Sequence, residues 1–297
     1  MSSLWVLAAL LGSLGQVARN AMQSSLTRQI GTVGATQVRF LFGLPFALIF
    51  LALVTLATGQ AIPIPNLPSL GFTTAGALAQ IAATGLMLEM MKSQSFAVTT
   101  AWLKTEPVIV ALAAALILRD PISLPMLAAI VIASAGVMLM SIKPGTRVWQ
   151  LGRPALTGLL AGGLFGASAI GFRGGITHLD QGGYLIRATA TLALSLLIQT
   201  ATLLIWMALF NRAALRGSFA VWRSSLFAGF LGAFASQFWF LGFALTSAAN
   251  VRTLALVEVI FATAVSRYGF KQPVSTRQII GMAVIVLSVG LLLRLQP

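Results

Sequence analysis

The chain is divided into apolar runs, each about as long as a helix that crosses a bilayer. A membrane-spanning helix needs about 20 apolar residues, because hydrocarbon offers no water to an exposed backbone. Ten runs meet this length, at 4–25, 34–57, 69–91, 96–118, 123–142, 155–176, 182–210, 225–246, 248–267 and 275–295. Only 8% of the residues are charged, against about 25% in an average soluble domain. The predicted fold class is an all-α polytopic membrane protein.

The composition excludes several classes of function. The chain has no cysteine, and its single histidine, His178, cannot form a multi-histidine metal centre. Motifs such as HExxH, GxSxG and a phosphate-binding loop do not occur in the sequence, so we expect no enzyme, no cofactor and no metal. The net charge of +14 would suggest nucleic acid in a soluble protein. Here most basic residues lie in short loops, where they orient the chain against membrane lipid, and we expect no nucleic-acid partner.

The two halves of the chain repeat each other. The stretch 143–154 separates five runs from five, which predicts a first five-helix repeat at 1–148 and a second at 149–297 within one membrane domain. The second runs of the halves agree, since Gln37-Val38-Arg39-Phe40 matches Leu185-Ile186-Arg187-Ala188. An odd number of spans per repeat places the halves in opposite orientations. The sequence therefore predicts a 5+5 inverted repeat.

Two glutamates lie inside apolar runs, one in each half. Glu106 precedes Pro121 by 15 positions, and Glu258 precedes Pro273 by the same number. The chain has only 5 acidic residues, and a carboxylate in hydrocarbon is costly unless it is paired, protonated or faces a wet cavity. One polar feature duplicated in two membrane halves is typical of a transporter with its site at the repeat interface.

These features resemble the EamA family of the drug/metabolite transporter superfamily, over nearly the whole chain. The resemblance rests on the 5+5 pattern, on Arg39 and Arg187 near the starts of the second and seventh spans, and on the turns Asp120-Pro121 and Gln272-Pro273. It implies ten helices around a central cavity, with the fifth and tenth peripheral, and export of small organic metabolites or drugs. The chain departs from the family pattern at Gln272, where an acidic residue is usual, and in the loop 58–68, which has no basic residue.

Glu106 and Glu258 are the strongest candidates for substrate or proton binding. Burial favours the neutral form of a carboxyl group, so such a group can exchange a proton, or it can bind a substrate amine as a carboxylate. Pro107 loosens the helix beside Glu106, whereas Val259 gives the second half no such break, which predicts a larger role for Glu106. The alternative is a structural ion pair with an intramembrane base, for which four residues are available: Arg39, Lys104, Arg187 and Arg252.

Three of these bases are interpreted as structural counter-charges. Arg39 and Arg187 hold equivalent positions in the two halves, which favours a shared role in neutralising the glutamates over snorkelling to the interface. Arg252 lies in the same run as Glu258 and is the third candidate.

Lys104 and Trp102 lie on the same run as Glu106. Lys104 is two positions from Glu106, so the two point to different helix faces. Its counterpart in the second half is Leu256, and this asymmetry favours contact with substrate, with a snorkelling lysine as the rival reading. Trp102 could hold an organic cation or a ring, and otherwise anchors the helix at the membrane interface.

Polar residues also follow one face of the first run. Their spacings of 3, 4 and 4 place them together on a helix: Ser13, Gln16, Asn20 and Ser24. Gln80 in the third run and Gln237 in the eighth have the same character. Lipid cannot satisfy these groups, so they line a cavity or form hydrogen bonds between helices.

A glycine stripe marks the sixth run. Gly158, Gly162 and Gly166 form a GxxxGxxxG face, and small residues at this spacing let helices approach closely. We expect helix packing along this face.

The function predicted from these features is that of a secondary transporter that works by alternating access. Because no nucleotide site is evident, transport would be driven by a gradient, such as that of protons. The alternative is a lipid-handling protein or scramblase, which would need the polar stripe of the first run to be open to lipid. The expected partners are a small-molecule substrate and membrane lipid, with the protein a monomer or homodimer, multi-pass in a bacterial inner (plasma) membrane. Loops after the odd-numbered spans hold 11 basic residues and the opposite side 2, so the positive-inside rule predicts external termini.

Overall fold

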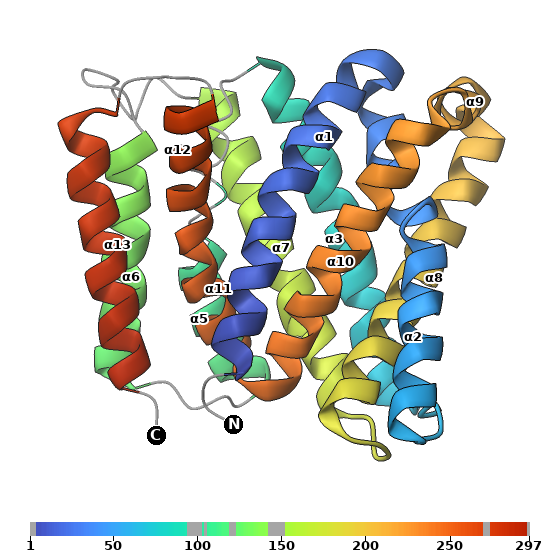
Figure 1. The fold of residues 1–297 in the computed structure, drawn as a ribbon, viewed down its shortest axis with the longest axis horizontal. Coiled ribbons are helices and arrows are strands. Elements are labelled where there is room, and N and C mark those ends of the chain that lie inside the picture. The colour runs from blue at the N-terminus through green and yellow to red at the C-terminus, as the bar shows by residue number, and fades with distance from the viewer. Residues whose placement is uncertain are drawn as a thin grey trace.

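The structure, a computed structural model, describes residues 4–93, 103, 106–118, 123–141, 152–269 and 274–295. Every regular element in these ranges is a helix (Figure 1). The first half contains α1 (Leu4–Leu41), α2 (Leu44–Thr58), α3 (Leu67–Ser93), α5 (Glu106–Ile117) and α6 (Leu124–Ser141). The second half contains α7 (Gly152–Thr177), α8 (Tyr184–Phe210), α9 (Arg212–Ala220), α10 (Trp222–Leu245), α11 (Ala248–Leu254), the 3-10 turn η2 (Ala255–Val257), α12 (Glu258–Gly269) and α13 (Thr276–Arg294).

Six helical stretches of the described chain are long and apolar enough to cross a membrane. They are Leu4–Thr58, Leu67–Met90, Leu156–Thr177, Tyr184–Phe210, Trp222–Leu245 and Thr276–Arg294. The first has 55 residues, more than twice the length that one crossing needs, and its helix is interrupted at Gly31, where φ is 74°. Figure 1 shows the chain rising along the first part of α1, turning, and descending along the rest of α1 and α2. The helices Glu106–Ile117 and Leu124–Leu139 are apolar but shorter, and the arrangement of ten spans stays a prediction.

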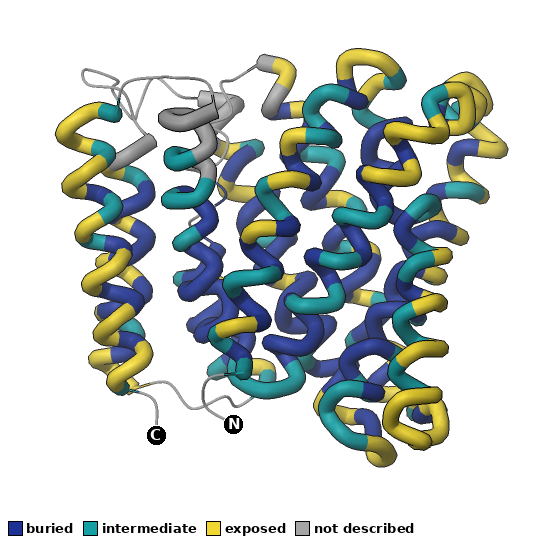
Figure 2. Tube along the Cα trace, viewed as in Figure 1, coloured by how far each residue is buried: buried dark blue, intermediate teal, exposed yellow. Residues whose placement is uncertain are grey.

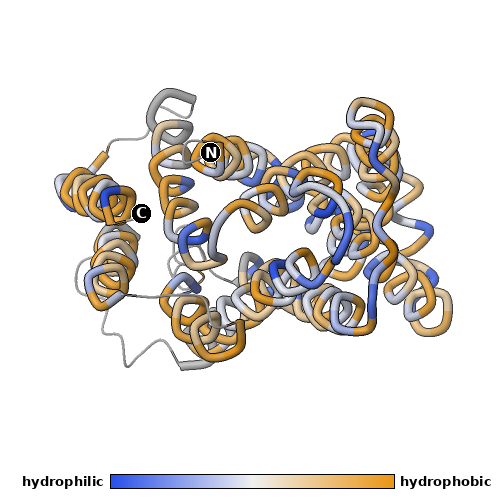
Figure 3. Tube along the Cα trace, turned by 90° about the horizontal axis from the view of Figure 1, so that it is seen from below, coloured by the Kyte–Doolittle hydropathy of each residue, from blue (hydrophilic) through white to orange (hydrophobic). Residues whose placement is uncertain are grey.

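The outer surface is apolar, as an integral membrane protein requires. Leu116 is 83% exposed, Leu287 74% and Phe210 73%. Soluble monomers rarely expose large contiguous apolar patches, because water disfavours apolar surface, whereas a bilayer accepts it. Seen along the helices, most of the trace carries hydrophobic residues (Figure 3). The chain is therefore an integral membrane protein.

The two halves interdigitate. Helix α3 packs along α7, α1 along α10, and α6 along α13, so each pair takes one helix from each half. The pair of α6 and α13 stands at one edge of the molecule (Figures 1 and 3). Buried positions gather on α5, α7 and α11, while much of α2 and α13 is exposed (Figure 2). The most buried part of the molecule thus lies where the halves meet.

Glycines set the closest approach of α3 and α7. A Cβ built on Gly171 would lie 2.7 Å from the Cα and amide nitrogen of Gly76, a distance that no real side chain tolerates. The glycine stripe predicted from the sequence contacts another helix. A Cβ on Gly166 would meet Val110 of α5 at 3.1 Å. The closest glycine contacts of α7 with α3 therefore lie at Gly171, Gly174 and Gly175, outside the predicted stripe.

Candidate functional site

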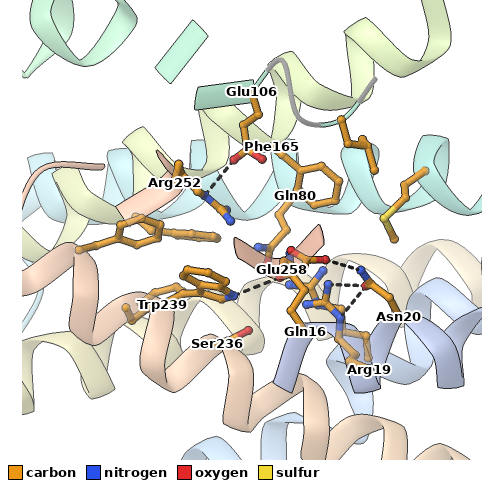
Figure 4. Close-up of a pocket in the computed structure, with 16 residues that line it drawn as sticks. Gln16, Arg19, Asn20, Gln80, Glu106, Phe165, Ser236, Trp239, Arg252 and Glu258 are labelled. Carbon is orange, nitrogen blue, oxygen red and sulfur yellow. Dashed lines mark hydrogen bonds and ion pairs between the residues drawn. The ribbon is translucent and has the colours of Figure 1, made fainter. Parts of the chain in front are cut away.

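A small cavity lies between the two halves, with walls from α1, α3 and α5 of the first half and α7, α10, α11 and α12 of the second (Figure 4). Its volume is about 40 Å³. Among the described residues, its charged wall residues are Arg19, Arg39, Glu106, Arg252 and Glu258. Its aromatic wall residues are Phe165, Phe172, Trp239, Phe240 and Phe243. Charged groups that hydrocarbon would disfavour are therefore collected at one inner point.

Glu106 forms an ion pair with Arg252 across the interface between the halves. Glu106 Oε1 lies 2.8 Å from Arg252 Nε, and both side chains are buried. The Arg252 guanidinium also lies over two rings, 5.3 Å from the centroid of Trp239 and 5.5 Å from that of Phe243. Arg252 is thus held by a carboxylate and by two aromatic faces, which is a favourable arrangement for a buried cation.

Glu258 accepts hydrogen bonds from neutral amides of α1. Gln16 Nε2 donates to Glu258 Oε2 at 3.0 Å, and Asn20 Nδ2 donates to Oε1 at 3.4 Å. Trp239 Nε1 in turn donates to Gln16 Oε1 at 3.1 Å (Figure 4). Gln16 and Asn20 reach one carboxylate because residues four apart share a helix face. The two glutamates therefore have different surroundings despite their matching positions in sequence.

Each glutamate is the first residue of a helix. Glu106 begins α5 and is followed by Pro107, which is tolerated in a first turn because the amide there has no intrahelical partner. Glu258 begins α12 directly after η2. A carboxylate in the first turn is stabilised by the helix dipole. The sequence predicted a local break only at Pro107, whereas the second half also has an irregular turn before its glutamate, so the halves differ less here than expected.

Two further arginines line the cavity. Arg19 donates from Nη2 to Asn20 Oδ1 at 2.8 Å, and its Nη1 is buried with no hydrogen-bond partner among the described residues. Arg39 donates from Nη1 to the hydroxyl of Thr84 at 3.2 Å. Arg19 is 1% exposed and Arg39 is 3% exposed. Both are buried cations whose hydrogen bonds in the structure go to neutral groups.

The structure brings together most of the residues predicted for the site. Cavity wall residues among them are Gln16, Asn20, Arg39, Gln80, Glu106, Arg252 and Glu258. Gln237 is not in the wall and donates to the Thr189 hydroxyl at 2.8 Å. Arg187 is not in the wall either, and it donates to the Leu179 carbonyl at 3.3 Å. Trp102 and Lys104 lie outside the described residues.

Among the described residues, Arg19 is a charged wall residue that was not predicted from the sequence. Its spacing was a usable signal, since it stands three positions after Gln16 and directly before Asn20, on the same helix face. The aromatic wall could not be found this way, because phenylalanines occur throughout a membrane helix. In the described part of the chain, no three histidine, cysteine or carboxylate side chains lie together as metal ligands would.

Comparisons with known proteins match the chain to a family model and to solved structures. The sequence model of the EamA-like transporter family matches residues 3–142 and again residues 153–294. A solved structure described as "Crystal structure of protein" superposes with a TM-score of 0.72 at 15% identity, covering 99% of this chain and 98% of the other. At this identity the likeness shows a shared fold. None of the curated proteins matches the chain.

Proposed function

Because the chain belongs to the EamA-like transporter family, we propose that it exports small organic metabolites or drugs by alternating access, as a secondary transporter. The family consists of membrane transporters of small molecules, not of enzymes. The observation that carries the proposal is the cavity between the halves, whose charged and amide groups are joined across the interface by the pairs Glu106–Arg252 and Gln16–Glu258. A site built from both halves changes shape when the halves move.

We propose two repeats, 1–148 and 149–297, each of five spans and related by an inverted two-fold axis. Such an axis maps each helix onto its equivalent in the other half. A contact between two helices must therefore recur between their two equivalents. The pairs α1–α10 and α3–α7 have this relationship, since each joins the first long helix of one half to the third of the other. The pairs α6–α13 and α2–α8 join equivalent helices and map onto themselves.

The cavity supports a closed conformation. Pockets that bind small molecules measure about 300–1,000 Å³, whereas this cavity measures about 40 Å³ and takes a few waters. A metabolite can enter only if the contacts between the halves are rearranged. Alternating access supplies that rearrangement, because it opens the same site first to one side of the membrane and then to the other.

Proton coupling through Glu106 or Glu258 stays a prediction. Among the described contacts, Glu106 pairs with the Arg252 guanidinium, and Glu258 accepts hydrogen bonds from the amides of Gln16 and Asn20. Flux measured in proteoliposomes with and without an imposed pH gradient tests this. A flux that does not respond to the gradient would rule out coupling to protons.

No second function is proposed. A scramblase would need the polar stripe of α1 to be open to lipid, but Ser13 is 0% exposed and Asn20 6%.

We further propose that the protein works as a monomer or homodimer in a bacterial inner membrane, without a nucleic-acid partner or resident cofactor.

Flux of candidate compounds from proteoliposomes tests the proposal. The wild-type protein should carry at least one small organic compound, and Glu106→Gln should abolish that flux. Glu89→Gln is the matched control, because Glu89 pairs with Lys92 at 2.8 Å on an exposed helix end, away from the cavity. Full flux in Glu106→Gln would show that the substrate does not pass through the cavity. Lipid scrambling without solute flux would show that the protein is a scramblase.

A further inference from the structure

We infer that the transported substrate is a small organic monoanion, with an apolar or aromatic body, whose negative group is bound by Arg19 and Arg39. This inference rests on the proposed function and names its substrate class. Three observations support it. They are the balance of charge in the cavity, the Nη1 of Arg19 without a partner among the described residues, and the contacts that two of the aromatic rings already make with Arg252.

The described wall of the cavity carries one more positive than negative charge. Three guanidinium groups, of Arg19, Arg39 and Arg252, face two carboxylates, of Glu106 and Glu258. All five residues are at most 7% exposed. The excess charge therefore lies in the interior and not in water.

The rest of the chain offers little acid to balance this charge. The sequence has 5 acidic residues, of which Glu89 pairs with Lys92 on an exposed helix end. Asp180 accepts a hydrogen bond from Asn66 at 3.0 Å in an exposed loop. The fifth, Asp120, lies outside the described residues.

An arginine cannot remove the excess by losing its proton. The guanidinium stays protonated in proteins, unlike a lysine ammonium, which readily becomes neutral when buried. An uncompensated charge in a buried site is costly, so the site gains most from a ligand that brings one negative charge. A cationic substrate would increase the imbalance instead.

The geometry places the anion at Arg19 and Arg39. Arg252 is already paired with Glu106 at 2.8 Å. Arg19 Nη1 is buried without a partner among the described residues, and Arg39 donates to the neutral hydroxyl of Thr84. Guanidinium groups bind carboxylates through two parallel hydrogen bonds, which suits a carboxylate better than a spherical ion.

The aromatic wall supplies a place for the body of the substrate. Trp239 and Phe243 already lie against the Arg252 guanidinium, so these two rings hold a cation of the protein itself. Phe165 and Phe240 also line the cavity and offer apolar surface. An aromatic carboxylate would use both the arginines and these rings. Its export also needs no coupling ion, because a membrane potential that is negative inside drives an anion outwards.

Three ligands with the same phenylethyl body and different charge test the inference. They are 3-phenylpropionate, which is an anion, phenylalanine, which is a zwitterion, and phenethylamine, which is a cation. Ligands that bind the folded state raise its melting temperature, and the shift is measured on the purified full chain in detergent. We expect 3-phenylpropionate to bind with a Kd about tenfold or more below that of phenethylamine, with phenylalanine between them.

Matched arginine variants locate the binding. Arg39→Gln should weaken binding of 3-phenylpropionate about tenfold or more, because truncating one partner of a buried charge pair acts strongly on affinity. Arg187→Gln is the control, since Arg187 holds the equivalent position in the other half but lies outside the cavity wall. Arg19→Gln should behave like Arg39→Gln. Either cavity variant removes the excess charge, so its melting temperature without ligand should be unchanged or higher. Loss of an arginine with a purely structural role would lower the melting temperature instead.

Several results would overturn the inference. These are tighter binding of phenethylamine than of 3-phenylpropionate, stabilisation by chloride but by no organic anion, and anion binding that survives in both Arg19→Gln and Arg39→Gln. If Arg19→Gln fails to fold, Arg39→Gln and Arg39→Lys decide the question. Flux of a cation or neutral compound that Glu106→Gln abolishes would leave the proposed transport intact and make the substrate class wrong. Binding of the anion at the arginines without any flux would count against the transport and not against the anion site.

Discussion

Glu106 Oε1 and Arg252 Nε lie 2.8 Å apart, and the two residues belong to different halves of the chain. Glu106 begins α5, which lies against α11, the helix of Arg252. The pair is therefore a direct link between the halves at the cavity wall.

Breaking this pair should destabilise the protein unequally. Glu106→Gln removes a negative charge where positive charge is already in excess, and we expect it to lower the free energy of unfolding by about 3–5 kcal/mol. Arg252→Gln removes the excess and should cost less. In the double variant the cost should be smaller than the sum of the two, which a double-mutant cycle of unfolding in detergent measures. Additive effects would show that the two side chains do not interact.

Transport should also respond unequally to loss of the two carboxylates. Glu106→Gln leaves the Arg252 guanidinium without its charged partner and should abolish flux. Glu258→Gln keeps one acceptor oxygen, which can accept from Gln16 or from Asn20 but not from both in place, and should reduce flux by about tenfold or less. Flux from proteoliposomes, normalised to the amount of folded protein, measures both. Equal and full activity in both variants would exclude a transport role for either carboxylate.

The contact of α3 with α7 should be sensitive to a single methyl group. The Cβ of Gly171→Ala would lie 2.7 Å from backbone atoms of Gly76, which cannot move aside as a side chain can. We expect a loss of about 1–3 kcal/mol, seen as a lower melting temperature. Gly163→Ala on the same helix is the control, because its Cβ meets nothing within 4 Å, and it should be neutral or slightly stabilising. Equal melting temperatures for the two variants would contradict this packing.

Both termini should lie outside the cell. Helix α1 begins and α13 ends at the same end of the molecule, and the opposite end carries the turn within α1, α9 and the start of α13 (Figure 1). Exposed basic residues in or beside these segments are Arg28, Arg212, Arg216, Arg223 and Arg277. Basic loops stay in the cytoplasm, so the ends of the chain should face out. A reporter pair fused after Pro297, one active only inside and one only outside, checks this, and cytoplasmic activity would show that the basic loops were translocated.

The helices were the most predictable part of the structure. The run 182–210 corresponds to α8 at Tyr184–Phe210, and the run 225–246 to α10 at Trp222–Leu245. Hydrophobic continuity is a local property of the sequence, so it locates such helices well. Helix α9 was missed because it is short and basic, and its start depends on Asn211, whose side chain accepts from the Ala214 amide at 3.1 Å.

The sequence predicted which residues line the cavity better than it predicted which of them contact one another. The spacing of Gln16 and Asn20 already placed them on one face, and both contact Glu258. The partner of Glu106 could not be chosen from sequence, because four bases were available and the choice depends on how the halves dock. The exclusion of Arg187 from the cavity has the same origin, since equivalent positions in two repeats need not have equivalent surroundings.

The closed cavity also limits how tightly the protein can hold its cargo. A ligand that enters must first separate groups that now satisfy one another, such as Gln16 and Glu258, and this cost is subtracted from the free energy of its own contacts. Each 1.4 kcal/mol spent in this way weakens the apparent Kd about tenfold. If the protein works by the proposed alternating access, the same penalty would also hasten release on the far side of the membrane, so low affinity and fast release would have one structural cause.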